Sequence, residues 1–504
     1  MDSMDSALGE DTNRLLSLFA KKTVTINRDG RRSGYREYNS DLRKLTMKLL
    51  SHGIAATSVK VVYDSLHELF SSEFEKSEVP SRRWIQDQRD LIEPLVDSQI
   101  IEETNEAQSL TIMHDGSTCN KDGSKIYTVG VANEHNKFTA IHTKVVPNGT
   151  ADAAADAIIS CLTRDVIEKT DKCISDTAHA ALKTGRLLDD KMSEIINEPK
   201  ETKKINCSFH TGANMDDHHD KANPKAMKTM FLDFQVLFSS RDNSGHRRED
   251  LRIPLKDLLS ENTTCKTKSK RFLSKLGSRM ATSASNSLVT LLHRDVILQL
   301  IQEQKQLKQS DSDEEETTPV VKRLERVESL LIDNVWPLTA CRLGINTMML
   351  KCITLKMGKF ERNDQTVTQK KATLRSIYCL YEQLLKTDDS FGELRKMAVE
   401  IDDHDFQDAL SVVDLLLHKV SDFDKKSLSE QVKTAARNGF KKLKKDQDGI
   451  LQMADSEDLL LTTNRRSESI FATYKGLEKN FVGMTQERLE VLTRARINKV
   501  FLFS

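Results

Sequence analysis

The chain has 504 residues, of which 38% are hydrophobic and 30% are charged, and its 76 Lys and Arg residues balance its 76 Asp and Glu residues. This length is enough for two to four domains, each with its own hydrophobic core. A net charge of zero excludes a uniformly basic protein that coats nucleic acid, although local basic patches can still bind phosphate.

The sequence contains no signal that points to a membrane or to secretion. No apolar run approaches the roughly 20 residues of a membrane span, and Met1–Ser6 has neither the basic start nor the apolar stretch of a signal peptide. The 8 cysteines include no Cys-x-x-Cys pair and fit reduced thiols. We therefore expect no membrane partner and a location in the cytosol or nucleus.

Residues 13–106 are expected to form an N-terminal helical region, preceded by a disordered segment at 1–12. Asn13–Lys22 is typical of a short helix and Asn27–Gly34 of a basic loop. Three further helices are expected: one from Ser40-Asp41 to His52-Gly53, one over Ser58–Phe70 and one over Pro80–Ile101. Their outline is similar to a helix-turn-helix, and a plain helical bundle fits it equally well.

An α/β segment is expected over residues 107–215, in the order β-β-β-α-β-α-β. Its strands are indicated by short apolar or alternating runs: Leu110–Thr118, Ile126–Val131, Phe138–Val146, Cys173–Ser175 and Ile205–Phe209. Asp115 lies in the first of these runs. Asp176 comes directly after the fourth.

The pattern from 216 to 455 is helical, with an acidic loop near 310–319. Its basic residues Lys266, Lys268, Lys270 and Arg271, and a second cluster at Lys441–Lys445, either keep this region soluble or form a track for DNA. In the final part, 456–504, Thr463 or Asn464 can cap a helix that carries Glu468 near its start. Glu478, Glu487 and Glu490 compete with Glu468 for any role of an acid in this part.

Three carboxylates, Asp115, Asp176 and Glu468, are the candidates for metal binding. Phosphoryl transfer on a nucleic acid commonly uses two divalent cations about 3.5–4 Å apart, and Mg²⁺ prefers carboxylate oxygens and keeps several waters. A central strand, its parallel neighbour and a flanking helix would bring the three acids together. The gap between Asp176 and Glu468 is too long for a loop, so it must contain a folded insertion.

Together these features resemble eukaryotic cut-and-paste DNA transposases of the DDE type, among them hAT, P-element-like and Kolobok-like elements. The matching motifs are His-Asp115-Gly-Ser-Thr, Ile-Ser-Asp176-Thr-Ala, Asn-Arg-Arg-Ser-Glu468-Ser and the Cys-x-x-His of Cys207 and His210. The resemblance covers about residues 109–215 and 455–490. It implies a ribonuclease-H-like mixed five-stranded sheet, interrupted by a large all-helical insertion and preceded by N-terminal helices.

The resemblance also implies an activity. Asp115, Asp176 and Glu468 would hold Mg²⁺ or Mn²⁺, cut DNA at the ends of a transposon and join the freed 3′-hydroxyl to target DNA. The protein would then be nuclear and a homo-oligomer. Arg465 and Arg466 could hold a phosphate near Glu468.

Other interpretations fit the same residues. Asp115 can be the first residue of an ordinary Asx turn. Cys207 and His210 give only two of the four ligands of a zinc site, so a buried thiol and a hydrogen-bonded histidine are expected there, and Asp216–Asp220 is expected to be a solvated helix face. The alternatives for the whole protein are a catalytically inactive, transposase-derived DNA- or protein-binding factor and a stand-alone nuclease. Neutral net charge favours the binding factor.

Overall fold

The computed structural model describes residues 21–28, 31–38, 40–69, 79–118, 124–146, 148–176, 178–238, 282–310, 319–480 and 484–499. The chain forms two compact units, of which the first combines Met1–Lys204 with Asn464–Ser504 and the second is Ile205–Thr463. Several expected features lie outside the described residues: the segment 1–12, the basic residues Lys266, Lys268, Lys270 and Arg271, and most of the acidic loop near 310–319.

A mixed five-stranded sheet is the centre of the first unit. Its strands are β3 (Leu110–Thr118), β4 (Lys125–Asn133), β5 (Phe138–Val146), β6 (Thr170–Ser175) and β7 (Lys203–Asn206), in the spatial order β5-β4-β3-β6-β7. The central strand β3 is antiparallel to β4 and parallel to β6. The predicted α/β class and mixed five-stranded sheet are therefore confirmed.

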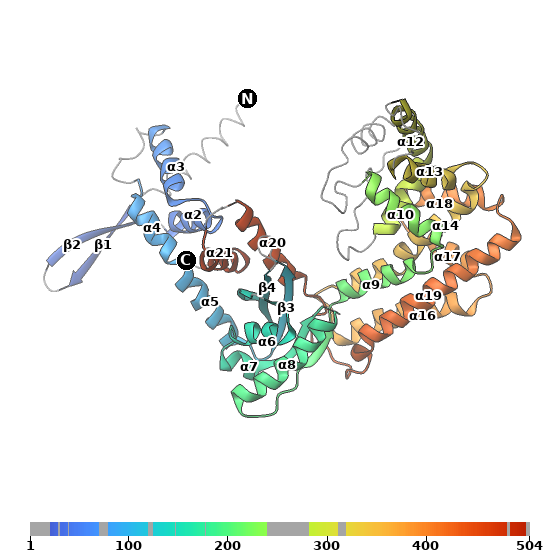
Figure 1. The fold of residues 1–504 in the computed structure, drawn as a ribbon. Coiled ribbons are helices and arrows are strands. Elements are labelled where there is room, and N and C mark those ends of the chain that lie inside the picture. The colour runs from blue at the N-terminus through green and yellow to red at the C-terminus, as the bar shows by residue number, and fades with distance from the viewer. Residues whose placement is uncertain are drawn as a thin grey trace, which may run out of the picture. The chain divides into compact units, whose positions relative to one another are not determined.

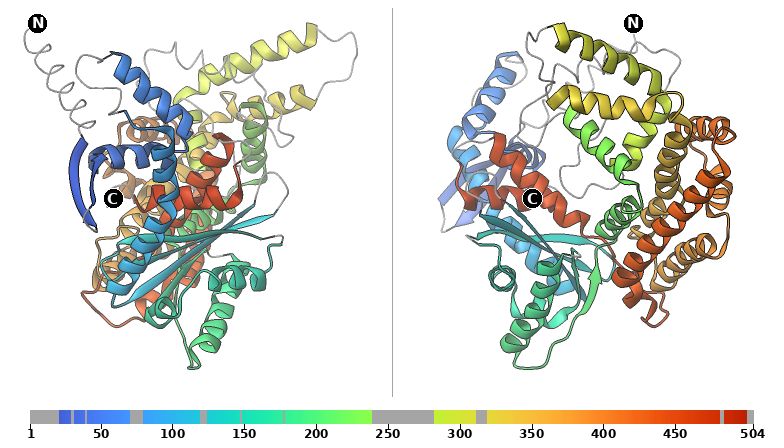
Figure 2. Two further views of the ribbon diagram at one scale, coloured as in Figure 1. Left: turned by 90° about the vertical axis from the view of Figure 1, so that its left-hand side faces the viewer. Right: turned by 45° about the vertical axis from the view of Figure 1, so that its right-hand side comes forward.

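Helices cover both faces of this sheet, as the left view of Figure 2 shows. They are α6 (Ala151–Ile159), α7 (Arg164–Lys169) and α8 (His179–Ile196) on one face, and α20 (Arg465–Asn480) and α21 (Gln486–Ile497) on the other. On the first face Ile112 and Val129 pack with Leu188 of α8. On the second, Ile126 belongs to a core that includes Tyr474 and Leu489 of α20 and α21. The alanine-rich stretch from Ala151 to Arg164 predicts one helix, but α6 ends at Ile159 and α7 begins at Arg164.

The N-terminal region contains the expected helices, but it also contains a hairpin. The helices are α2 (Ser40–Ser51), α3 (Ala56–Leu69), α4 (Arg82–Asp90) and α5 (Ile92–Glu106), and the hairpin strands are β1 (Lys21–Arg28) and β2 (Arg31–Tyr38). The prediction of a basic loop over Asn27–Gly34 was therefore wrong. The overlooked signal was the β-branched run Thr23–Ile26 before Asp29-Gly30, a pair favoured in two-residue hairpin loops.

The single helix predicted over Pro80–Ile101 is also wrong, because the structure breaks it at Leu91 between α4 and α5. Pro94 explains the break. A proline ring clashes with the carbonyl of the residue four positions earlier, so a proline is tolerated in the first turn of a helix but not in its interior. Pro94 accordingly lies in the first turn of α5.

The second unit is built mainly from helices (Figure 1). They are α9 (Ser208–Asp220), α10 (Lys225–Phe238), α12 (Thr282–Ser310), α13 (Pro319–Leu331), α14 (Trp336–Cys352), α15 (Met357–Phe360), α16 (Val367–Lys386), α17 (Ser390–Val399), α18 (His404–Leu417) and α19 (Asp422–Leu451). Helix α14 is buried on nearly all sides and packs against α12, α17 and α18. Among the described helices, none has the length and apolar character needed to cross a membrane.

Candidate active site

The two aspartates predicted to act together, Asp115 and Asp176, are carried by neighbouring parallel strands: Asp115 lies within β3, and Asp176 directly follows the last residue of β6. Met113 of β3 is level with Ile174 of β6, so each aspartate follows its paired residue by two positions. Both aspartates line one cavity of about 270 Å³. The structure thus brings these two carboxylates together, in half-buried positions where a ligand can reach them.

Asp115 lies on the sheet face that α20 covers. It is directly opposite Thr128 of β4, and residues opposite one another in an antiparallel pair point to the same face. The Thr128 hydroxyl donates a hydrogen bond to the carbonyl of Ser467 at the start of α20 (3.4 Å). Two residues beyond Asp115, the Ser117 hydroxyl accepts one from Nζ of Lys475 in the same helix (2.8 Å).

Glu468 is on the side of α20 that faces β3, but it does not line the cavity. It lies in the first turn of α20, seven residues before Lys475, and positions i and i+7 share one side of a helix. Its Oε1 atom is buried. Glu468 is therefore on the correct face for a site with Asp115, whereas the structure does not bring it into the cavity of the two aspartates.

The competing glutamates have other positions. Glu490 forms ion pairs with His142 and with Arg494, an arrangement that ties α21 to β5. Glu487 is exposed in the first turn of α21, and Glu478 is half-buried near the end of α20. None of these three lines the cavity of Asp115 and Asp176.

The same cavity contains further polar side chains that the sequence did not single out: His114, Lys125, Tyr127 and Thr184. Burial, and then the charge of Lys204, lowers the pKa of His114 to about 4, so its ring is neutral at physiological pH. Burial raises the pKa of Tyr127, which keeps its hydroxyl protonated. Only the register of β3 with β4, which follows from folding, places Lys125 and Tyr127 here.

Two glycines allow the side chains of Tyr127 and Lys125 to pack closely against the backbone at this cavity. A Cβ on Gly116 would lie 2.7 Å from the Tyr127 ring, and one on Gly149 would lie 2.9 Å from the Lys125 side chain. Substitution at either position would push a cavity residue aside. Gly116 therefore has a packing role next to Asp115, whose Oδ1 accepts a hydrogen bond from the Gly116 amide (2.8 Å).

The donor set fits a hard divalent cation in part. Mg²⁺ can be held by one or two carboxylates with waters and substrate phosphates as its other ligands, and Asp115 and Asp176 supply two carboxylates to one cavity. Within the described ranges, however, no group of three His, Cys, Asp or Glu side chains is placed to hold a metal ion. The expected three-carboxylate site is thus not assembled.

The two candidate arginines differ in their surroundings. Arg466 donates a hydrogen bond to the carbonyl of Asn136 (2.8 Å) and lies over the Phe138 ring at 6.0 Å. Burial lowers the pKa of Arg466. Arg465 is exposed. Arg466 therefore ties α20 to the β4–β5 turn, and of the two Arg465 has the position better suited to a phosphate.

The Cys-x-x-His pair lies in the second unit, at the start of α9. Cys207 is completely buried there, with its sulfur 3.9 Å from the hydroxyl of Thr463. The His210 ring is half-buried and meets the ring of Phe209 edge-on. Cys207 is therefore a buried thiol, as expected.

The prediction of a solvated face at Asp216–Asp220 was wrong. Asp216 and His219 are buried, and the Nε2 atom of His219 is 2.8 Å from the hydroxyl of Tyr381 in α16. The face is covered because α9 packs against α19. In the second basic cluster, Lys442 pairs with Asp446 at 3.0 Å and Lys444 lies over the Phe440 ring, so both have contacts within the helical unit.

No family model matches this chain, and no curated protein matches its sequence.

Proposed function

We propose that the protein cuts and joins DNA strands in the manner of a DDE transposase, with Asp115 and Asp176 as its central carboxylates. One observation carries the proposal. Two acids that are far apart in the sequence, one in a central strand and one directly after its parallel neighbour, line the same cavity. Paired carboxylates can hold the divalent cations that phosphoryl transfer on nucleic acids commonly uses.

The architecture supports a ribonuclease-H-like core. The strand that carries Asp115 is central, its parallel neighbour ends just before Asp176, and α20 packs on the strand that carries Asp115. A folded helical unit, Ile205–Thr463, separates the second acid from α20. This is the order of parts that the sequence motifs led us to expect.

The proposal gives each residue a role. Asp115 and Asp176 would hold Mg²⁺, and Glu468 would join them from α20. The bound cation would supply positive charge to the phosphate oxygens and activate the attacking nucleophile. Lys125, which lines the same cavity, would attract the phosphate. His114 is neutral because burial lowers its pKa to about 4, so it adds no charge to the site.

A second candidate function is a transposase-derived binding protein without chemistry. The position of Glu468 outside the cavity favours it, as does the lack of a three-ligand group in the described part of the chain. In this case the carboxylates would be remnants, and the protein would still bind DNA or another protein.

Nicking and joining of DNA distinguish the candidates. The full chain is incubated with supercoiled plasmid and a labelled oligonucleotide in Mg²⁺ or Mn²⁺. Nicking with joining of the label supports the transposase, nicking alone indicates a nuclease, and binding alone indicates the binding protein. Asp115→Asn should lower the nicking rate by about a thousandfold, because the lost ligand contributes several kcal/mol. An unchanged rate in a folded variant rejects the proposal.

A further inference from the structure

A second and larger cavity of the first unit, of about 640 Å³, is lined by three arginines. Arg82 and Arg89 come from α4, and Arg488 comes from α21, almost four hundred residues later. Positions 82 and 89 are seven apart, so they lie on one side of α4. The cavity does not contain Asp115, Asp176 or any other residue that lines the carboxylate cavity.

The wall of this arginine cavity is cationic. Among the described residues that line it there is no Asp or Glu. Arg89 pairs with Asp90 at 3.2 Å, whereas within the described part of the chain neither Arg82 nor Arg488 has an ion pair. Burial, and then the charge of Arg89, lowers the pKa of Arg488, while Asp90 and Glu93 oppose this effect. An anion between these guanidinium groups would relieve their mutual repulsion.

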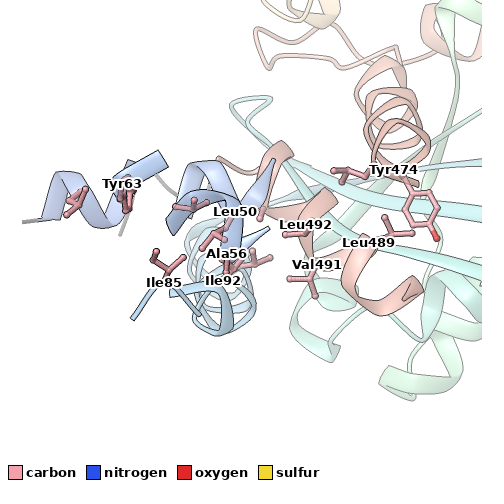
Figure 3. Close-up of a cluster of buried hydrophobic side chains, with 14 of the residues drawn as sticks. Leu50, Ala56, Tyr63, Ile85, Ile92, Tyr474, Leu489, Val491 and Leu492 are labelled. Carbon is pink, nitrogen blue, oxygen red and sulfur yellow. The ribbon is translucent and has the colours of Figure 1, made fainter. Parts of the chain in front are cut away.

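The cavity is also lined by apolar side chains. Leu50, Ala56 and Leu492 belong to the buried core that Figure 3 shows between the N-terminal helices and α21. Ile54, which is 36% exposed, and Met484 are further apolar residues of the lining. A simple phosphate ion would leave these apolar side chains without a contact. The cavity therefore matches a ligand that has an anionic end and a flat, weakly polar body.

Cavity size and chemistry agree with one class of ligand. Cavities of about 300–1,000 Å³ hold small molecules, a guanidinium plane stacks on a base as well as binding phosphate, and aliphatic side chains can cover the other face of a base. The start of α3, at Ala56 and Thr57, also lines the cavity. Its backbone amides add partial positive charge near an anion.

We propose that the arginine cavity binds a nucleoside phosphate, as a free nucleotide or as an unpaired nucleotide of a DNA strand. The phosphate lies among Arg82, Arg89 and Arg488, and the base lies against Ile54 and Met484. This inference does not depend on the proposed cleavage chemistry, since it uses none of the residues of the carboxylate cavity.

Binding is measured with the full chain in EDTA, so that no metal-mediated contact with Asp115 or Asp176 contributes. A fluorescein-labelled thymidine oligonucleotide reports on binding by anisotropy, with ATP and inorganic phosphate as competitors. Arg82→Gln and Arg488→Gln should each weaken binding about tenfold, the effect of one charge-assisted hydrogen bond. Each should also lower the slope of log affinity against log salt by about 0.7.

Arg83→Gln is the matched control, because Arg83 is the exposed neighbour of Arg82 on α4 and does not line the cavity. It should change the affinity less than twofold. Competition by ATP identifies the free nucleotide as a ligand, and binding of the oligonucleotide without competition identifies the strand. Met484→Ala should weaken nucleotide binding and leave the dissociation constant of inorganic phosphate unchanged.

Three results would overturn the proposal. The first is wild-type affinity in Arg82→Gln, whose exposed side chain can be replaced without disturbing the core. The second is equal weakening by Arg83→Gln, which would indicate general charge attraction. The third is binding of anionic phospholipid vesicles in preference to both nucleotide probes, which would make the cavity a lipid-headgroup site.

Discussion

The buried side chain of His219 makes the stability of the protein depend on pH. Its ring is completely enclosed in the helical unit, its Nε2 is 2.8 Å from the Tyr381 hydroxyl, and among the described residues its Nδ1 has no hydrogen-bond partner. Burial, and then the charge of His218, lowers the pKa of His219 to about 3. The folded protein therefore excludes a proton that the unfolded chain binds below about pH 6.5.

This exclusion predicts a loss of stability in acid. The contribution of neutral His219 is fully present above pH 6.5 and is lost as the pH falls towards 3, by up to about 1.4 kcal/mol per pH unit. Urea unfolding at pH 7, 6, 5 and 4 measures it. His219→Gln should flatten the dependence, and His404→Gln, at a histidine whose side chain is 84% exposed, should not. The same acid slope in His219→Gln as in the wild type would contradict this prediction.

The neighbouring arginines at the start of α20, Arg465 and Arg466, should respond differently to substitution. Arg466→Ala removes the hydrogen bond to Asn136 and the contact with Phe138, so it should lower the free energy of unfolding by about 1–2 kcal/mol. Arg465→Ala should leave it within about 0.5 kcal/mol, as at other exposed positions, and should weaken binding to DNA. Chemical denaturation and anisotropy measure the two effects. If Arg466→Ala weakened DNA binding and Arg465→Ala lowered the stability instead, Arg466 would be the residue that binds phosphate.

Only some residues of the carboxylate cavity could be predicted from the sequence. Asp115 and Asp176 could be proposed because each follows an apolar run, and the ends of parallel strands meet at one edge of a sheet. Lys125 and Tyr127 could not be proposed, because nothing in their local sequence differs from an ordinary half-buried strand. Their place in the cavity depends on the register of β4 with β3.

At the scale of elements, helix α19 depends on glycine at one position. A Cβ on Gly439 would lie 2.2 Å from Nε2 of His219 and 2.5 Å from the Tyr381 hydroxyl. Gly439→Ala should therefore lower the free energy of unfolding by about 1–3 kcal/mol, the usual cost of overpacking. Gly449 is the matched control in the same helix, since nothing lies within 4 Å of its added Cβ.

Gly449→Ala should be neutral or should stabilise the protein by about 0.5–1 kcal/mol, because alanine has the higher helix propensity. Both variants are compared by chemical denaturation. Equal stabilisation by the two substitutions would mean that α9, α16 and α19 can move apart without cost, and would contradict the close packing of these helices.

Elements with strong periodicity were the ones that sequence alone predicted well. The runs Ile126–Val131 and Phe138–Val146 alternate with period two, the run from Leu110 is apolar up to Met113, and all three strands are present. Where the structure differs from the prediction, the sequence contains only a short signal for the observed element. Asp29-Gly30 indicated a hairpin within an expected loop, and Pro94 indicated the break between α4 and α5.

The sheet and the helical insertion could be predicted from the sequence, but the position of Glu468 relative to Asp115 and Asp176 could not. The gap between Asp176 and Glu468 required a folded insertion, and the structure has the helical unit Ile205–Thr463 there. Whether Glu468 meets the two aspartates depends on how α20 sits on β3. Lys475 and Ser467 fix that helix against the sheet, on the face where Asp115 lies.

The most direct measurement is a crystal structure of the full chain grown with Mn²⁺, with anomalous scattering to locate the ions. Our proposal predicts Mn²⁺ bound by Asp115 and Asp176, with a carboxylate oxygen of Glu468 at an ion in the same site. The matched Asp176→Asn crystal should lose this density, while Asp171→Asn, at the exposed acid of β6, should keep it. If millimolar Mn²⁺ bound only at other residues, or if no Mn²⁺ were bound by Asp115 and Asp176, the proposal of a metal-dependent enzyme would be contradicted.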